Sequence, residues 1–225
     1  MQTSSAILLA GLLLAVPPAA AATPAPFDPT AMNADMVHLE HEWARITYQV
    51  KDHDQQLDQI DALNKEAQGI VAKYPGHAEP LIWNGIIASE EAAQASVFTA
   101  LGYAKDALAL FQKAEQIDAK AIHGAVPMSL GTLYYRVPGF PVGFGDNDKA
   151  RHYLEQAMAL DPDGLDANYF YGDFLIEQGE YPKAKQVLTH ALAAPNDPAR
   201  PVWDAGRRAE VRALLDKVNG KIASR

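Results

Sequence analysis

The feature that most constrains the fold is a pattern that recurs along the chain. In its last copy, residues 166–191 have apolar side chains at helical spacing on both sides of a turn that contains Gly179. Gly172 lies before this turn, and Ala184 and Leu188 lie after it. Small residues on both sides of a turn allow two helices to pack closely, so the segment predicts a helical hairpin. A recurring hairpin predicts a stack of helical repeats.

The preceding copy keeps both halves of the pattern but has a longer middle. More residues separate Gly131 from Ala150 than separate Gly172 from Ala184. The additional residues fall in 136–148, where prolines and glycines prevent the helix from continuing. We expect this insertion to pack as a defined loop, because its aromatic side chains are costly to leave wholly exposed.

Three further regions complete the predicted organisation. A fainter copy at 81–114 has an insertion at 86–106, and we expect its helices to be longer than those of the other copies. An N-terminal helical pair at 33–76 precedes the repeats, which extend over 77–198. Residues 199–225 predict a C-terminal capping helix. Such a helix covers the unpaired apolar face that the last repeat of a stack leaves open.

The residues of the last copy resemble the tetratricopeptide repeat (TPR), with Gly172 where the helices approach, Gly179 and Tyr181 at the turn, and Ala184 at a close-packing position. The chain as a whole is similar to periplasmic TPR proteins. A narrower resemblance, to the T-component of TRAP-type organic-acid transporters, rests on residues 145–157. The TPR resemblance implies an all-α, right-handed helical-repeat solenoid. It also implies a non-enzymatic scaffold whose concave groove is lined by the first helix of each hairpin.

The register of the TPR resemblance also implies which positions face the groove. Together with the neighbouring loop, it gives these expected partner-binding residues: Met128, Thr132, Tyr135, Arg136, Phe140, Phe144, Tyr169, Asp173, Ile176 and Glu177. Aromatic anchors and charge pairing suit a protein or peptide partner in an extended or helical conformation. The alternative is that the enlarged loops bury many of these side chains. A second possible function is an accessory protein that binds a small anionic solute through Arg136 for a transport system.

The second insertion allows two interpretations. In the functional one, it forms a wall of the binding site with Arg136 and the two tyrosines before it. In the structural one, Phe140 and Phe144 fill the widened hairpin, and Asp146 or Asn147 caps the next helix. Substitution of the two phenylalanines separates these interpretations, because only the structural one predicts a loss of stability with binding intact.

The N-terminus carries the signature of an export signal. Residues 1–22 have no charged side chain and contain an apolar run at 6–16. A run of this length suits a signal-peptide core, whereas a membrane-spanning helix needs about 20 apolar residues. We therefore expect a signal peptide at 1–22 and a flexible mature N-terminus at 23–32, which predicts a periplasmic or secreted protein without stable membrane insertion. An uncleaved anchor or an apolar disordered tail is the alternative.

Charge and cysteine content exclude several functions. The net charge is −9, whereas nucleic-acid binding needs concentrated lysine and arginine. The chain has no cysteine, which excludes disulfides and thiolate chemistry. Basic residues nevertheless outnumber acidic ones in 200–225. A solvated surface of the capping helix explains this cluster most simply, and docking to an acidic or lipid surface is the alternative.

The sequence offers one arrangement that resembles a metal site. His38 and His41 share one face of a predicted helix at a spacing able to hold zinc, but no third ligand can be assigned. An exposed polar helix face is the simpler interpretation. No Gly-x-Ser-x-Gly element or nucleotide-binding glycine motif is present. We therefore expect no metal, no cofactor and no enzymatic activity, and the oligomeric state stays open.

Overall fold

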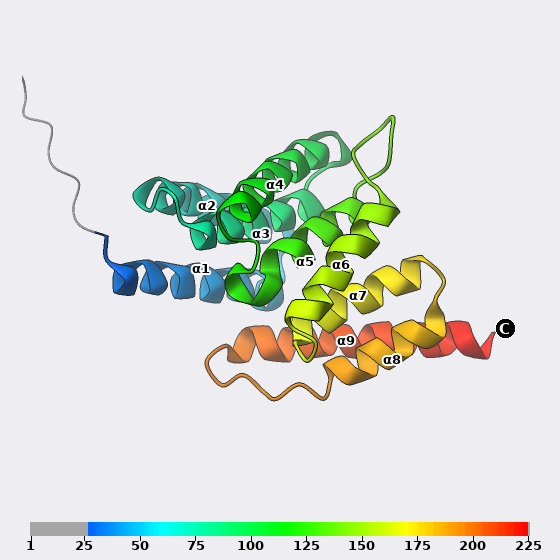
Figure 1. Cartoon of the computed structure of the whole chain (residues 1–225). Coiled ribbons are helices and arrows are strands. Elements are labelled where there is room, and N and C mark those ends of the chain that lie inside the picture. Colours follow the sequence, from blue (N-terminus) through cyan, green and yellow to red (C-terminus); the bar gives the residue numbers. More distant parts are fainter. Residues whose placement is uncertain (1–26, 225) are drawn as a thin grey trace, which may run out of the picture.

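The computed structural model describes residues 27–224, which form nine α-helices (Figure 1). In chain order these are α1 (Pro29–Gln49), α2 (His53–Lys73), α3 (Ala78–Gln94), α4 (Val97–Asp118), α5 (Ala121–Arg136), α6 (Asn147–Leu160), α7 (Leu165–Glu177), α8 (Tyr181–Ala191) and α9 (Pro201–Ala223). The predicted signal peptide at 1–22 lies outside the described residues.

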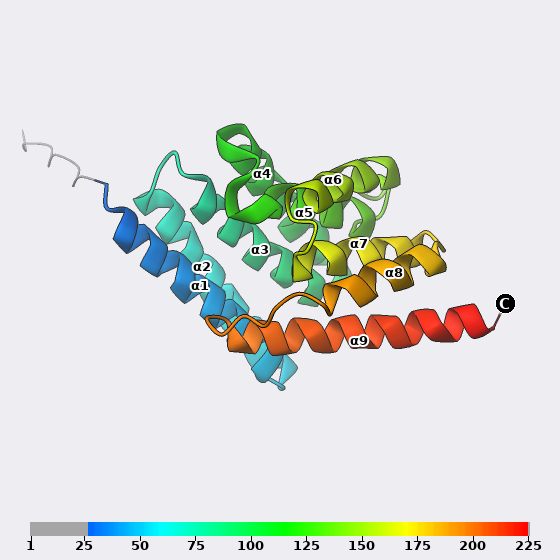
Figure 2. The ribbon, with the colours of Figure 1, turned by 60° about the horizontal axis from the view of Figure 1, so that its bottom comes forward.

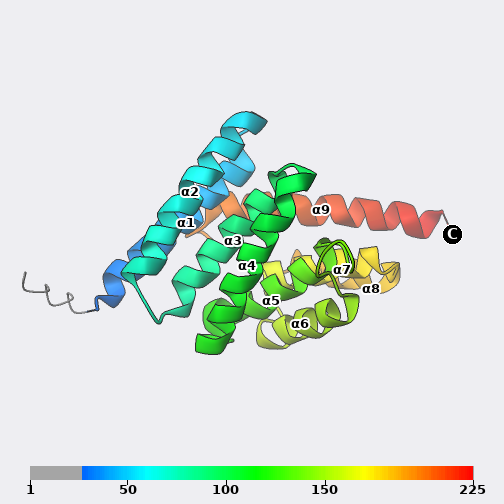
Figure 3. The same ribbon diagram turned by 90° about the horizontal axis from the view of Figure 1, so that it is seen from above.

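The first eight helices pack as four successive hairpins. Helices α1 and α2, α3 and α4, α5 and α6, and α7 and α8 contact each other within their pairs. The first helices of neighbouring pairs also contact one another, so that α1, α3, α5 and α7 form one layer. Figure 3 shows this succession from above, from α1 and α2 to α7 and α8. The predicted all-α helical-repeat solenoid is therefore confirmed.

Three hairpins share one packing device, a glycine on the first helix against a large side chain on the second. A Cβ added to any of these glycines would lie 2.6 to 2.7 Å from the facing side chain, which is closer than Cβ atoms approach other atoms. The facing side chains are fully buried. The pairs are Gly85 with Phe111, Gly131 with Leu154, and Gly172 with Leu188. These contacts fix the repeat register that the glycines predicted.

The insertion at 86–106 lengthens the helices of its hairpin, as expected, and does not form a long loop. Helix α3 continues to Gln94 and α4 begins at Val97, so the additional residues lengthen both helices. The segment is rich in alanine and has no proline, and this composition favours helix over loop. The second insertion does form a loop, over 137–146, between α5 and α6.

Helix α1 begins earlier than the sequence predicted. Residues 29–32 are helical, although they fall within the segment expected to be flexible at 23–32. The side chain of Asp28 accepts hydrogen bonds from the backbone N–H groups of Thr30 and Ala31. Pro29 occupies the first helical position, where its missing N–H costs nothing. This cap explains the earlier start.

Helix α9 occupies the region of the predicted capping helix but does more than cover one end. It contacts α7 and α8 and also contacts α1, the first helix of the stack. Figure 2 shows α9 beneath α7 and α8, with its N-terminal part against α1. Helix α9 therefore connects the last repeat to the first.

Candidate functional site

Residues predicted to face the groove meet at one buried carboxylate, that of Asp173 in α7. Asp173 is only 2% exposed. Its Oδ2 accepts a hydrogen bond of 2.6 Å from the hydroxyl of Tyr135 and forms an ion pair with the guanidinium of Arg136, both on α5. Burial and, second, the charge of Asp173 raise the pKa of Tyr135 well above its usual value, so the phenol stays a donor at neutral pH.

Arg136 is held in place at this cluster and remains accessible. Its guanidinium carbon lies 5.0 Å from the centroid of the Tyr135 ring, and its Nη2 donates to Asp173. The side chain is nevertheless 52% exposed. A guanidinium has five N–H donors in a planar fork, so Arg136 keeps donors for a carboxylate of another molecule.

The other predicted residues between α5 and α7 are less accessible. Ile176 is 4% exposed and belongs to the core, so its assignment to the binding surface is wrong for this conformation. Met128 and Thr132 are half-buried. The hydroxyl of Thr132 donates to the carbonyl of Met128 over 2.8 Å, so the Thr132 hydroxyl has its hydrogen-bond acceptor within α5.

The groove-facing side of α7 is covered by α9. The guanidinium of Arg207 lies over the ring of Tyr169 and pairs with Asp166, with 2.6 Å between Nε and Oδ1. Farther along α9, Lys217 pairs with Glu177 over 3.4 Å. Arg207 is only 5% exposed, so the interpretation of the basic cluster in α9 as a solvated surface is wrong for this residue. Acidic positions of the predicted groove are instead paired with basic residues of the chain's own C-terminal helix.

Helix α9 and Arg200, the residue that precedes it, also contact the first repeat. Arg200 pairs with Glu40 over 2.9 Å, and the hydroxyl of Tyr48 donates to Oε2 of Glu210 over 3.1 Å. Gly206 lies directly on the Tyr48 ring, where an added Cβ would come within 2.4 Å of Cγ. Helix α9 therefore packs against both α1 and α7, the first helices of the first and last hairpins.

The loop at 137–146 has the packing and capping contacts of the structural interpretation, but it leaves one of its two phenylalanines exposed. Phe144 is half-buried and packs edge to face on Tyr134, with 6.0 Å between the ring centroids. Asp146 accepts hydrogen bonds from two N–H groups of the first turn of α6 and so caps this helix. Phe140, by contrast, is 94% exposed, and Val142 is 66% exposed. Phe144 therefore fills the hairpin, whereas Phe140 projects into solvent.

Backbone hydrogen bonds hold this loop at its base. The N–H of Gly145 donates to the carbonyl of Pro138 over 2.9 Å, and the N–H of Asp146 donates to the carbonyl of Tyr134 over 2.8 Å. A further bond of 3.1 Å joins the N–H of Val142 to the carbonyl of Gly139. The exposed side chains of the loop are therefore presented on an ordered backbone.

The two histidines of α1 contact different partners. Nε2 of His38 lies 3.0 Å from a carboxylate oxygen of Glu66, and Nε2 of His41 lies 3.1 Å from the carbonyl oxygen of Ala199. Within residues 27–224, no group of three or more His, Cys, Asp or Glu side chains is arranged to hold a metal ion. No helix in this part of the chain is long and apolar enough to cross a membrane.

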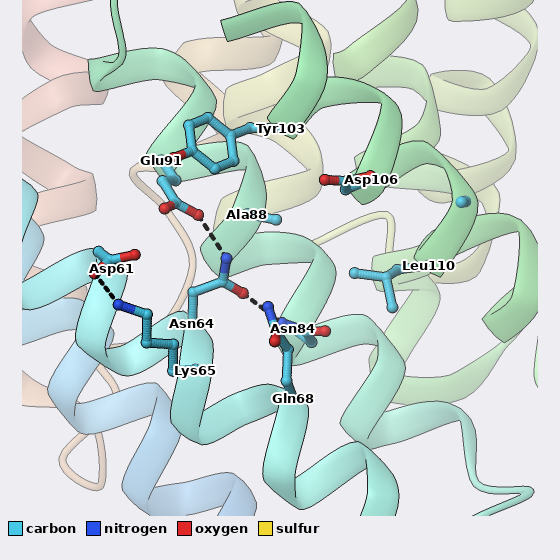
Figure 4. Close-up of a pocket in the computed structure, with 11 residues that line it drawn as sticks. Asp61, Asn64, Lys65, Gln68, Asn84, Ala88, Glu91, Tyr103, Asp106 and Leu110 are labelled. Carbon is cyan, nitrogen blue, oxygen red and sulfur yellow. Dashed lines mark hydrogen bonds and ion pairs between the residues drawn. The ribbon is translucent and has the colours of Figure 1, made fainter. Parts of the chain in front are cut away.

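A buried polar network between α2 and α3 was not predicted from the sequence. Nδ2 of Asn84 donates to Oδ1 of Asn64 over 2.6 Å, and Nδ2 of Asn64 donates to Oε2 of Glu91 over 2.5 Å (Figure 4). Its signal in the sequence is a polar residue on an apolar stripe, since Asn64 follows Ile60 by one helical turn and adjoins Leu63. A polar residue at such a position predicts a buried hydrogen-bond partner.

Comparisons with known proteins agree with this architecture. Residues 142–217 match the family model described as tetratricopeptide repeat. The fold resembles the crystal structure of a thermophilic TPR protein of Thermus thermophilus, with a TM-score of 0.51 and 17% sequence identity over 80% of this chain and 98% of that one. At this identity the likeness concerns the fold alone. A search of curated proteins found no match. Residues 142–217 therefore match the tetratricopeptide repeat, and the described part of the chain has a TPR-like fold.

Proposed function

We propose that the chain is a non-enzymatic scaffold that binds a protein partner through the Arg136 edge, a surface formed by Arg136, Phe140 and Val142. The observation that carries this proposal is the exposure of Phe140, at 94%, on a loop whose backbone is held by hydrogen bonds. Exposure of an aromatic ring to water is unfavourable in free energy for the unbound protein. Burial of that ring by a partner therefore contributes strongly to binding.

The chemistry of the Arg136 edge suggests what the partner presents. Arginine and aromatic side chains dominate the binding energy of protein interfaces, and an ordered loop loses little conformational entropy on binding. Arg136 and Phe140 are four residues apart, so their Cα atoms lie within about 14 Å of each other. We therefore expect a partner with an apolar recess for Phe140 and a carboxylate for Arg136.

The Arg136 edge is preferred to the full concave groove of the sequence analysis because α9 packs along the groove-facing side of α7. Glu177 and Tyr169 contact residues of α9 rather than a free surface. A small anionic solute has less support, because Phe140 and Val142 beside Arg136 expose apolar surface, which a protein partner buries and a small anion does not.

Export remains part of the proposal and rests on the sequence of residues 1–22. Their apolar core and the small residues that follow it suit a signal peptide. The partner is then expected in the periplasm or outside the cell. Mass measurement of the protein purified from its native cells tests this, because cleavage near Ala22 removes a defined N-terminal mass.

Photocrosslinking from position 140 tests the binding surface. A probe there replaces a side chain that supports little of the fold, whereas a probe at Tyr135 would break the hydrogen bond to Asp173. The matched control is a probe at Ile117, which is also exposed but lies at the end of α4. We expect a protein adduct from position 140, none from position 117, and loss of the adduct in an Arg136→Ala variant that is folded by circular dichroism.

A second variant separates charge from geometry. Arg136→Lys keeps the positive charge beside Asp173 but loses the planar fork that binds a carboxylate with two hydrogen bonds. We expect it to weaken the adduct while the thermal stability stays close to that of the wild type. Equal labelling from positions 140 and 117, or an adduct insensitive to both Arg136 variants, would contradict the proposal.

A further inference from the structure

A cleft lies among α2, α3 and α4 and shares no residue with the Arg136 edge. It has a volume of about 420 Å³, which is in the range of small-molecule binding sites. Helix α3 contacts both α2 and α4. Figure 4 shows side chains of all three helices around the cleft.

The buried side of the cleft is a chain of hydrogen bonds that ends on Glu91. Asn84, Asn64 and Glu91 are 3%, 8% and 4% exposed. A carboxylate only accepts hydrogen bonds, so Asn64 must turn its N–H₂ group to Glu91 and its carbonyl oxygen to Asn84. The direction of the chain is therefore fixed, and it leads to a negative charge at the cleft.

Glu91 lacks a cationic partner. No ion pair in the described part of the chain includes its carboxylate, and the nearby Lys65 instead pairs with Asp61 over 2.5 Å. Tyr103 of α4 lines the cleft together with Glu91. Because burial disfavours the charged form, the pKa of Glu91 is raised. An entering cation would supply the missing charge to this carboxylate.

The rest of the cleft also favours a positively charged ligand with a short hydrocarbon part. Asp61, Glu91 and Asp106 line it together with one base, Lys65, so carboxylates are in excess. Leu110 and two alanines provide apolar lining, and the ring of Tyr103 offers a face for a cation. This combination matches an aliphatic amine rather than an anion.

We propose that this cleft binds a small aliphatic primary amine, whose ammonium group donates to Glu91 while its hydrocarbon part packs on the apolar lining beside Leu110. Asp106 supplies a second negative charge on the side of α4. An ammonium ion has three donors and no acceptor, which complements a site that ends in a carboxylate. This site is independent of protein binding at the Arg136 edge.

Calorimetric titration of the full chain with n-butylammonium chloride at constant ionic strength tests the proposal. The comparison ligand is n-butanol, which has the same hydrocarbon part without the charge. We expect saturable binding of the ammonium ion and at least about tenfold weaker binding of the alcohol, because a charge-assisted hydrogen bond is lost. Equal binding of the two ligands, or no saturable binding of the ammonium ion, would overturn the proposal.

Two variants and one control locate the site. Glu91→Gln keeps the shape of the side chain and an oxygen that accepts from Asn64, and we expect it to weaken ammonium binding by about tenfold or more. Asp106→Asn changes an exposed side chain, so it should fold normally and weaken binding by a smaller factor. Asp58→Asn, on the exposed side of α2 outside the cleft, should leave the affinity unchanged. The assignment would be refuted if both variants, each folded, bound n-butylammonium with the affinity of the wild type.

Discussion

Arg207 of α9 lies over the ring of Tyr169 of α7, with 4.3 Å between its guanidinium carbon and the ring centroid. The same side chain pairs with Asp166 and with Glu210, and it is 5% exposed. A buried arginine with two carboxylates and an aromatic ring around it joins the C-terminal helix to the last repeat. The ion pairs of the buried Arg207 therefore help to position α9 against α7.

The first prediction concerns this buried cation. Arg207→Ala leaves Asp166 without its partner and removes the packing on Tyr169, so we expect the free energy of unfolding to fall by about 3 kcal/mol. Urea unfolding measures this change. Arg212→Ala is the matched control, because Arg212 is on the same helix and exposed, and a change within about 0.5 kcal/mol is expected there. Similar effects of both substitutions would show that Arg207 is not the anchor.

A pair of glycines in α9 gives the second prediction. A Cβ at Gly206 would lie 2.4 Å from Cγ of Tyr48, whereas a Cβ at Gly220 would meet nothing within 4 Å. Gly206→Ala should therefore separate α9 from α1 and destabilise the protein by about 1–3 kcal/mol. Gly220→Ala should raise the stability by up to about 1 kcal/mol, because alanine favours helix over glycine.

Thermal unfolding of the two glycine variants checks this difference in sign. Hydrogen exchange adds a local measurement, since faster exchange confined to α1 and α9 in Gly206→Ala would place the effect at their contact. A stabilising Gly206→Ala substitution would mean that the two helices do not pack closely in solution.

The third prediction is a pH dependence that comes from Glu91. Burial raises the pKa of Glu91 in the folded protein above its value in the unfolded chain. The folded state therefore binds the proton more tightly, and the contribution of this residue to stability decreases as the pH rises through the raised pKa. Relative to Glu91→Gln, the wild type should gain stability when the pH is lowered from about 7 to about 5.

Urea midpoints of both proteins at the two pH values measure this effect. Glu90, whose pKa burial also raises, is present in both proteins, so its contribution cancels in the difference between them. A difference that does not change with pH, or that changes in the opposite direction, would mean that Glu91 is not buried as a carboxylate.

The repeat register could be predicted from the sequence because it depends on local features. Gly131 and Gly172 must be small where two helices of one hairpin touch, and the partner leucine follows within the same repeat unit. The same register correctly placed Tyr135 and Asp173 on facing helices, where they form a hydrogen bond. Contacts within one repeat and between adjacent repeats thus account for both results.

The course of α9 could not be predicted in the same way. Its contacts with α1 join residues such as Tyr48 and Glu210, which are far apart in the sequence and have no repeat relationship. The basic residues of α9 signal this docking, because they complement acidic groove positions such as Glu177. Charge composition alone does not distinguish an internal partner from a solvated surface. Ile176 was assigned to a binding surface by the repeat register, which does not show that packing against neighbouring helices buries this side chain.

The last prediction uses the two phenylalanines of the loop at 137–146. Phe140 is 94% exposed, whereas Phe144 is half-buried against Tyr134. Phe140→Ser should change the free energy of unfolding by less than about 0.5 kcal/mol. Phe144→Ser should lower it by about 2 kcal/mol, because it removes apolar surface from the hairpin.

The same two variants distinguish an effect on stability from an effect on partner binding. If Phe140 contacts the partner, Phe140→Ser abolishes the photocrosslinked adduct, detected here from a probe at Val142, while the melting temperature stays that of the wild type. Phe144→Ser should lower the melting temperature and retain the adduct at temperatures where the variant is folded. The opposite assignment, with binding dependent on Phe144 and stability dependent on Phe140, would require the loop to turn over. Such a change would break the hydrogen bond that joins Gly145 to Pro138 at its base.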